Sequence, residues 1–137
     1  MNKTEVLVFS TRPITKLDID TAYTWQQEWG VTPIEKKLYP QKGLMLYYGD
    51  KESMLGFLWS NDSAMAKIGF ITRNPSVKQL PKQTKEILIR SLIDYAKELG
   101  YQYVGGWVSD EYTKKAFRDI GFTETSNNVS EFLAKIN

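Results

Sequence analysis

The feature that most constrains this sequence is a strand, helix and strand pattern in its second half. Residues 65–72 are an apolar run that ends at a basic loop. The following segment repeats apolar residues at helical spacing from Leu88 to Leu99, and Gly100 is placed to end that helix. Residues 101–108 then return as a second strand. Because strands joined by a helical crossover within about forty residues run parallel, the sequence predicts a right-handed βαβ unit.

Three earlier runs predict the rest of the sheet. Residues 5–10, 43–48 and 54–59 are rich in β-forming residues. The last two flank a turn at residues 49–53, which predicts an antiparallel hairpin. Three antiparallel strands therefore lead into the βαβ unit.

Other segments predict helices on either side of these strands. Asp18 opens a helical pattern that Gly30 ends, and residues 33–38 suggest a short second helix. Residues 111–120 form a last helix before Gly121.

The C-terminal part allows two interpretations. Residues 123–125 and 131–136 flank a turn at residues 126–128, which indicates a hairpin or a terminal helix, and we favour the hairpin. The expected fold is a single α/β domain over residues 1–137. Its mixed, mostly antiparallel sheet has six or seven strands with one central parallel pair, and helices cover both faces.

Charge and composition exclude several classes of function. The 137 residues include 18 basic and 16 acidic ones, a net charge of +2, which argues against a general nucleic-acid binder. The absence of cysteine and histidine removes thiolate zinc sites, cysteine nucleophiles and the commonest general base, and no metal site is expected. No apolar run has the length of a membrane span, and the N-terminal residues lack a signal-peptide pattern, so we expect a cytoplasmic protein.

A basic loop precedes the long helix. Arg73, Lys78, Lys82 and Lys85 lie there without an intervening anion. Lysines do not suit the positive end of a helix dipole, but together with free backbone N–H groups they form an anion site.

The segments at residues 96–101 (AKELGY) and 117–122 (FRDIGF), in this order of elements, resemble the GNAT superfamily of N-acyltransferases. The resemblance covers most of the chain in topology and is sharp over about residues 65–125. It implies an acyl-CoA substrate, acetyl-CoA or another acyl-CoA. Its pantetheine arm is expected along the backbone of Phe70, Ile71 and Thr72. Its phosphates are expected at Lys78, Lys82, Gln83, Thr84 and Lys85.

The phosphate loop departs from the family pattern. Two glycines of that pattern fall on Gln83 and Lys85, although glycine is what allows a backbone to approach phosphate closely. Three interpretations remain open. The side chains bind CoA or another polyphosphate instead, the surface is simply solvated, or it binds an acidic macromolecule.

The proton-transfer positions also differ. The family tyrosine that protonates the leaving thiolate corresponds to Phe117, and residues 65–72 contain no carboxylate base. Tyr112 and Asp110 remain as candidates. Tyr112 lies about 140° around the helix from Phe117, and the position of Asp110 and Glu111 at the start of a helix favours a capping role.

Five aromatic residues are candidates for substrate binding: Trp25, Trp29, Tyr47, Trp59 and Trp107. Each also suits ordinary packing between helix and sheet. Gly105 and Gly106 interrupt the last strand, which indicates a bulge, close helix packing or space for a ligand.

The resemblance implies an N-acyltransferase that acts on a small-molecule or protein amine. We expect a monomer or homodimer, and the charge and hydropathy of the sequence argue against a nucleic-acid or membrane partner. The alternative is a non-catalytic module of the same fold that binds a protein or small ligand. An open groove between the strands at residues 65–72 and 101–108 favours the enzyme. A groove filled by Trp107, Phe117 or the 73–82 loop favours the module.

Overall fold

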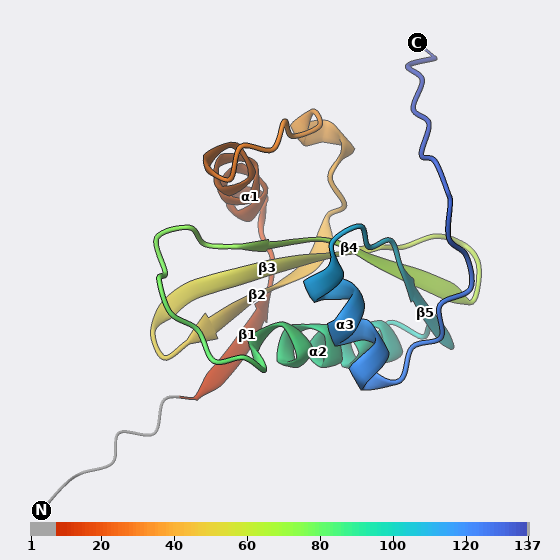
Figure 1. Ribbon diagram of the computed structural model, residues 1–137. Helices are drawn as coiled ribbons and strands as arrows, with labels where there is room; N and C mark the ends of the chain where they lie inside the picture. The colour runs from red at the N-terminus through yellow and green to blue at the C-terminus, as the bar shows by residue number, and fades with distance from the viewer. Residues whose placement is uncertain (1–7, 137) are drawn as a thin grey trace, which may run out of the picture.

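The computed structural model describes residues 8–136. Within this range one five-stranded sheet, in the order β1-β2-β3-β4-β5, lies between helices (Figure 1). The elements are β1 (Phe9–Pro13), α1 (Lys16–Glu28), the 3-10 turn η1 (Lys36–Leu38), β2 (Lys42–Tyr48), β3 (Lys51–Trp59), β4 (Met65–Arg73), α2 (Thr84–Glu98), β5 (Tyr103–Gly106) and α3 (Glu111–Ile120).

The predicted βαβ unit is present. Strands β1 to β4 pair antiparallel in sequence order, whereas β4 and β5 run parallel and are joined by α2. Helix α1 covers one face of the sheet, and α2 with α3 covers the other (Figure 1). Helices on both faces and one parallel pair are therefore confirmed. Within the described residues this pair lies at the edge of the sheet and not at its centre, because no further strand pairs with β5.

Alternating residues of the strands supply two cores. On β2, Leu44 and Leu46 join the cluster beneath α2, whereas Met45 joins the cluster beneath α1. On β3, Leu58 faces α2 and Phe57 faces α1. This is the period-two pattern of strands that are buried on both faces.

Helix α1 begins two residues before the predicted Asp18, because Thr15 and Asp18 cap it. The Thr15 N–H donates to the Asp18 carboxylate at 2.7 Å, and the Asp18 N–H donates to the Thr15 carbonyl at 3.0 Å. Thr15 and Asp18 have the spacing of a capping box. Helix α2 likewise begins at Thr84, slightly later than Pro81 or Lys82, where its proline suggests a start.

The sheet is smaller than predicted. Five strands lie within residues 8–136, not six or seven, and residues 122–136 form neither a strand nor a helix. The favoured C-terminal hairpin is therefore not found. Phe122 packs against Phe117, but the later apolar side chains of this segment, Val129, Phe132, Leu133 and Ile136, stay exposed. Little burial therefore offsets the entropy of ordering a hairpin. The expected first strand at residues 5–10 overlaps β1, and residues 5–7 lie outside the described range.

Within the described residues, no helix combines the length and the apolar character needed to cross a lipid bilayer.

Candidate functional site

Strands β4 and β5 separate halfway along β4. They pair from Met65↔Tyr103 to Ile68↔Gly106, and β5 then ends while β4 continues to Arg73. Within the described residues, the second half of β4 therefore has no strand beside it on this edge. The separation opens at the carboxyl end of two parallel strands, where α/β sheets commonly place their sites.

A β-bulge coincides with the separation. Leu55 pairs with Thr72 and Phe57 pairs with Gly69, so β4 holds one residue more than β3 across this interval. Phe70 adopts a left-handed backbone conformation with a φ of 53°. This conformation costs a non-glycine residue roughly 1–2 kcal/mol. Bulges are over-represented next to active sites, where they redirect side chains.

The bulge reverses the alternation of β4. Before it, Ala66 and Ile68 face α2; after it, Ile71 faces α2 and Phe70 faces α1. Phe70 is thereby directed to the same face as Gly69. One extra residue has moved the downstream side chains to the opposite face.

A chain of hydrogen bonds from α1 holds the bulge. The Thr72 hydroxyl donates to the Phe70 carbonyl at 3.0 Å, and Gln26 Nε2 donates to Thr72 Oγ1 at 3.3 Å. The Tyr39 hydroxyl in turn donates to Gln26 Oε1 at 2.7 Å. Burial raises the pKa of Tyr39, which keeps this hydroxyl protonated as a donor. These contacts fix the strained carbonyl of Phe70 from the α1 side.

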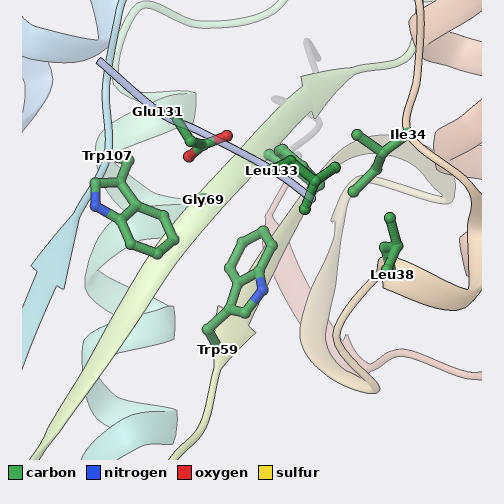
Figure 2. Close-up of a pocket in the computed structure, with 8 residues that line it drawn as sticks. Ile34, Leu38, Trp59, Gly69, Trp107, Glu131 and Leu133 are labelled. Atoms are coloured by element: carbon green, nitrogen blue, oxygen red, sulfur yellow. The ribbon is translucent and has the colours of Figure 1, made fainter. Parts of the chain in front are cut away.

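A cavity of about 240 Å3 lies beside the bulge on the α1 face (Figure 2). Its walls come from the bulge, β3, the loop after β5, the region around η1 and the terminal segment. The lining residues are Ile34, Leu38, Trp59, Gly69, Phe70, Trp107, Glu131 and Leu133.

Aromatic contacts form the floor of this cavity. The Trp59 ring meets Phe70 at 4.8 Å and Trp107 at 5.9 Å between centroids, both nearly edge-on. A Cβ at Gly69 would lie 2.7 Å from the Trp59 ring, so glycine is required for Trp59 to lie flat against β4. The structure thus brings two predicted substrate residues, Trp59 and Trp107, to the bulge at Phe70.

The other three aromatic candidates lie elsewhere. Trp25 is buried in the core beneath α1, and Tyr47 lies in a polar cluster with Arg12 and Glu52. Trp29 is 53% exposed, and its indole N–H donates to the Arg73 carbonyl at 2.7 Å. None of the three lines the cavity.

The loop expected to hold phosphates is internally braced. The Arg73 guanidinium donates to the carbonyls of Val77 and Lys78 at 2.7 and 2.8 Å. Thr84 is buried, and its hydroxyl donates to the Pro81 carbonyl at 2.6 Å.

Three of the expected phosphate-binding side chains are exposed, namely those of Lys78, Lys82 and Gln83. Lys85 instead reaches α3, where its Nζ donates to Thr113 Oγ1 at 2.8 Å and lies 4.0 Å from the Asp110 carboxylate. The charges that remain directed at solvent are therefore those of Lys78 and Lys82.

Asp110 is a helix cap. Its carboxylate accepts hydrogen bonds from the N–H and the hydroxyl of Thr113, both at 2.9 Å. Burial alone would raise the pKa of Asp110, but these bonds and the charge of Lys85 outweigh it and hold the pKa below its ordinary value. A carboxylate stabilised in its charged form is a poor base. Tyr112 is 84% exposed on the outer side of α3.

The glycines of β5 are explained by close packing. A Cβ at Gly106 would lie 2.8 Å from the Phe117 ring, which is buried beneath the sheet and contacts Phe122. Phe117 therefore lies in the core below the point of separation, and Trp107 borders the cavity without filling it.

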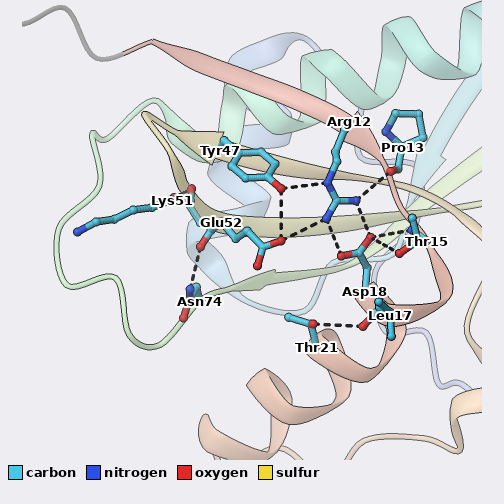
Figure 3. Close-up of polar contacts among 11 residues, drawn as sticks. Arg12, Pro13, Thr15, Leu17, Asp18, Thr21, Tyr47, Lys51, Glu52 and Asn74 are labelled. Atoms are coloured by element: carbon cyan, nitrogen blue, oxygen red, sulfur yellow. Dashed lines mark hydrogen bonds and ion pairs between the residues drawn. The ribbon is translucent and has the colours of Figure 1, made fainter.

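The polar cluster of Arg12, Tyr47 and Glu52 also anchors the start of α1, through Asp18 (Figure 3). The Arg12 guanidinium donates to both oxygens of Asp18, at 2.7 and 2.9 Å, and to Glu52 at 3.2 Å. The bonds to Asp18 and Tyr47 raise the pKa of Arg12. Burial opposes ionisation of Asp18, yet the bonds from Arg12 and Thr15 lower the pKa of Asp18 overall. All five N–H groups of the Arg12 guanidinium donate to protein acceptors, so this cluster has a structural role.

The sequence did not indicate five of the lining residues as site residues: Ile34, Leu38, Gly69, Glu131 and Leu133. The first two lie near a short 3-10 turn, and the last two lie far along the chain from the bulge. Hydropathy identifies neither pair, because only the tertiary fold brings them to Phe70.

The fold is thus a mixed α/β sheet that separates at a bulge in β4 and carries helices on both faces. No protein-family profile matches the sequence. A sequence search of curated proteins likewise gives no match.

Solved structures do match. Aminoglycoside N-acetyltransferase AAC(6')-Iy in complex with CoA is 17% identical, covers 99% of this chain and 100% of its own, and gives a TM-score of 0.68. The ribosomal-protein-S18-alanine N-acetyltransferase of Escherichia coli is 17% identical, with 87% and 80% coverage and a TM-score of 0.69. Glucosamine-6-phosphate N-acetyltransferase of Arabidopsis thaliana is 14% identical, with 93% and 99% coverage and a TM-score of 0.62. The chain has the GNAT fold, as the sequence resemblance implied.

Proposed function

We propose that this protein is an acyl-CoA-dependent N-acyltransferase. The observation that carries this proposal is the separation of β4 from β5 at Phe70, which opens onto a cavity on the α1 face. The same fold holds CoA in the complex with the aminoglycoside N-acetyltransferase.

The residues present suit the two ends of an acyl-CoA differently. Along residues 70–72, an edge of β4 without a neighbouring strand offers backbone groups to the amides of a pantetheine arm. At the phosphate end, Gln83 and Lys85 replace the glycines of the family pattern, so the exposed cations of Lys78 and Lys82 would supply the attraction. We therefore expect phosphate binding through side chains, with a strong dependence on salt.

The reaction needs little from the protein beyond placement. The neutral amine nitrogen attacks the thioester carbonyl carbon, an amide bond forms, and the carbon–sulfur bond breaks. CoA leaves as a thiolate, and the proton lost from nitrogen passes to water. Holding the two reactants together can supply much of the rate enhancement, and a thiolate is a good leaving group because its acid has a pKa near 8.5.

Thermal unfolding with millimolar acetyl-CoA, CoA or ATP tests the binding step. Ligand at a hundred times its dissociation constant adds about 2.7 kcal/mol of stability, a shift on the order of 5–10 °C for a domain of this size. The double variant with Lys78→Ala and Lys82→Ala should lose most of this shift. Lys97→Ala is the matched control, because it also removes one exposed lysine but at the far end of α2 from the loop. A shift with ATP equal to that with acetyl-CoA would contradict a site selective for acyl-CoA.

Released thiol tests the chemical step. The chain contains no cysteine, so a thiol reagent detects only the CoA set free. Acetyl-CoA with a panel of amines should give amine-dependent thiol release.

The competing function is a non-catalytic module, and one observation favours it: Phe117, at the position of the family's proton donor, is buried in the core. Acetyl-CoA binding without thiol release for any amine would support the module.

A further inference from the structure

The cavity beside the bulge has a distinctive chemical composition. Its lining combines three aromatic rings, three aliphatic side chains and a single carboxylate, Glu131. No lysine or arginine is among these lining residues. Figure 2 shows the Glu131 carboxylate on the terminal segment; Glu131, Trp107 and Gly69 line the same cavity.

One aromatic ring of the lining, Trp107, already contacts an ammonium group of the protein itself. Lys67 Nζ lies 4.3 Å from the centroid of the Trp107 ring, within the range of a cation–π contact. Lys67 is outside the lining, so the cavity side keeps the Glu131 carboxylate and the Trp59 ring available to a ligand.

We propose that this cavity binds a small primary amine carried on an apolar body, such as an arylalkylamine. The amine is captured as its ammonium ion, which pairs with the Glu131 carboxylate and gives up one proton to water before the neutral nitrogen attacks. The apolar body packs against Trp59, Trp107 and Leu38. This inference rests on the proposed function and names the class of its acceptor.

Size and polarity argue against other amines. The volume of about 240 Å3 is below the roughly 300–1,000 Å3 of sites for drug-sized ligands. The cavity is open to solvent where Glu131 and Leu133 line it, so the further charges of a polycation or a sugar phosphate would stay in water and gain no partner there. A lining of six apolar side chains and one carboxylate satisfies one charge only.

The terminal segment completes the cavity. It runs from the α3 side past β5 to the α1 side of the sheet (Figure 1), and it contributes Glu131 and Leu133. Acceptor selectivity therefore lies in a segment without helix or strand, separate from the β4 backbone that faces the acyl donor.

Binding is tested by titrating the intrinsic tryptophan fluorescence without acetyl-CoA. The probes are 2-phenylethylamine, its neutral analogue 2-phenylethanol, and spermidine as a polycation. We expect saturable quenching by 2-phenylethylamine and a two- to fivefold weaker affinity for the alcohol, the range of an exposed ion pair. Spermidine should bind at least tenfold more weakly. Equal affinity for amine and alcohol, preference for spermidine, or no quenching would each overturn the proposal.

Substitutions assign the effect to the cavity. Glu131→Gln should weaken the amine two- to fivefold and leave the alcohol unchanged, whereas Leu133→Ala should weaken both. Glu98→Gln, an exposed carboxylate on α2 on the opposite side of the sheet, is the control and should change neither. Loss of amine affinity in the Glu98→Gln variant would contradict the assignment.

Failure of this inference is distinguishable from failure of the proposed function. Acetyl-CoA binding with thiol release from spermidine but not from 2-phenylethylamine would reject the acceptor class and keep the enzyme. Quenching by 2-phenylethylamine without an acetyl-CoA shift would keep the cavity's ligand class and reject the acyltransferase.

Discussion

The two faces of the sheet are covered in different ways. The α2–α3 face is closed by apolar side chains, including the fully buried Leu88, Ile89 and Leu92. The α1 face is held partly by polar contacts at Asp18 and Gln26 and leaves a cavity over the bulge. The same strands supply both faces through alternate residues, so the difference comes from the helices that cover each face, α1 on one side and α2 with α3 on the other.

This difference separates stability from ligand binding. Substitutions on the closed face should change the free energy of unfolding, because no space is available there. Substitutions around the cavity should change binding with a smaller effect on stability. Four predictions examine that separation.

The largest expected effect contrasts two aromatic residues. Phe117→Ala should destabilise the fold by about 3–5 kcal/mol, because it leaves a cavity beneath Gly106. Trp107→Ala, at a half-exposed side chain, should cost about 1 kcal/mol or less. Urea unfolding measures both. Equal losses would show that Trp107 belongs to the core.

The next contrast concerns two strand glycines. A Cβ at Gly56 would lie 2.7 Å from Leu92 Cδ1 on the closed face, so Gly56→Ala should cost about 1–3 kcal/mol. Gly69→Ala should cost less, because Trp59 can move into the cavity, and it should abolish quenching by 2-phenylethylamine. Calorimetric melting and the fluorescence titration test the pair. Retained amine binding in Gly69→Ala would contradict the position of Trp59.

The polar attachment of α1 predicts a dependence on pH. The folded-state pKa of Asp18 lies below its unfolded value near 3.8, so its pairing stabilises the fold above that pH and is lost as the pH falls below it. Asp18→Asn should cost about 1–2 kcal/mol at pH 7 and flatten the stability profile between pH 2 and 5. Glu98→Gln serves as the control. An unchanged slope in Asp18→Asn would exclude Asp18 as the titrating group.

The smallest effect concerns the support of the bulge. Thr72→Val removes the hydroxyl that joins Gln26 to the Phe70 carbonyl, and it should cost about 1 kcal/mol. Acetyl-CoA affinity should fall several-fold, because the backbone of residues 70–72 becomes less ordered. Tyr39→Phe, two hydrogen bonds further from Phe70 than Thr72, should have a weaker effect. Reversal of that order would contradict the proposed chain of contacts.

The sequence predicted what depends on local periodicity. Helix α2, its end at Gly100, the parallel pair and the helices on both faces follow from apolar spacing and glycine placement. The capping box at Thr15 and Asp18 carried a readable signal that the sequence analysis did not use. A Thr followed three residues later by an acidic residue fits the observed start of α1.

What depends on long-range contact was not predictable. The terminal segment has strand-like alternation, yet no free apolar face receives Phe132 and Ile136, and they remain exposed. The grouping of Glu131 with Trp107 depends on where that segment lies in the fold. No residue pattern predicts the bulge at Phe70, since the sequence of residues 65–73 is that of one continuous strand.

The bulge also divides the mutational constraints within a single strand. At residues 65–68 the permitted substitutions depend on the packing against α2 and the pairing with β5. At Gly69 and Phe70 they depend on the cavity, and along residues 70–72 on the edge of β4 that the acyl donor is proposed to use, whereas Ile71 still packs against α2. The positions of β4 that face α1 can therefore change separately from those that face α2. A new ligand specificity on the α1 side requires no repacking of the core beneath it.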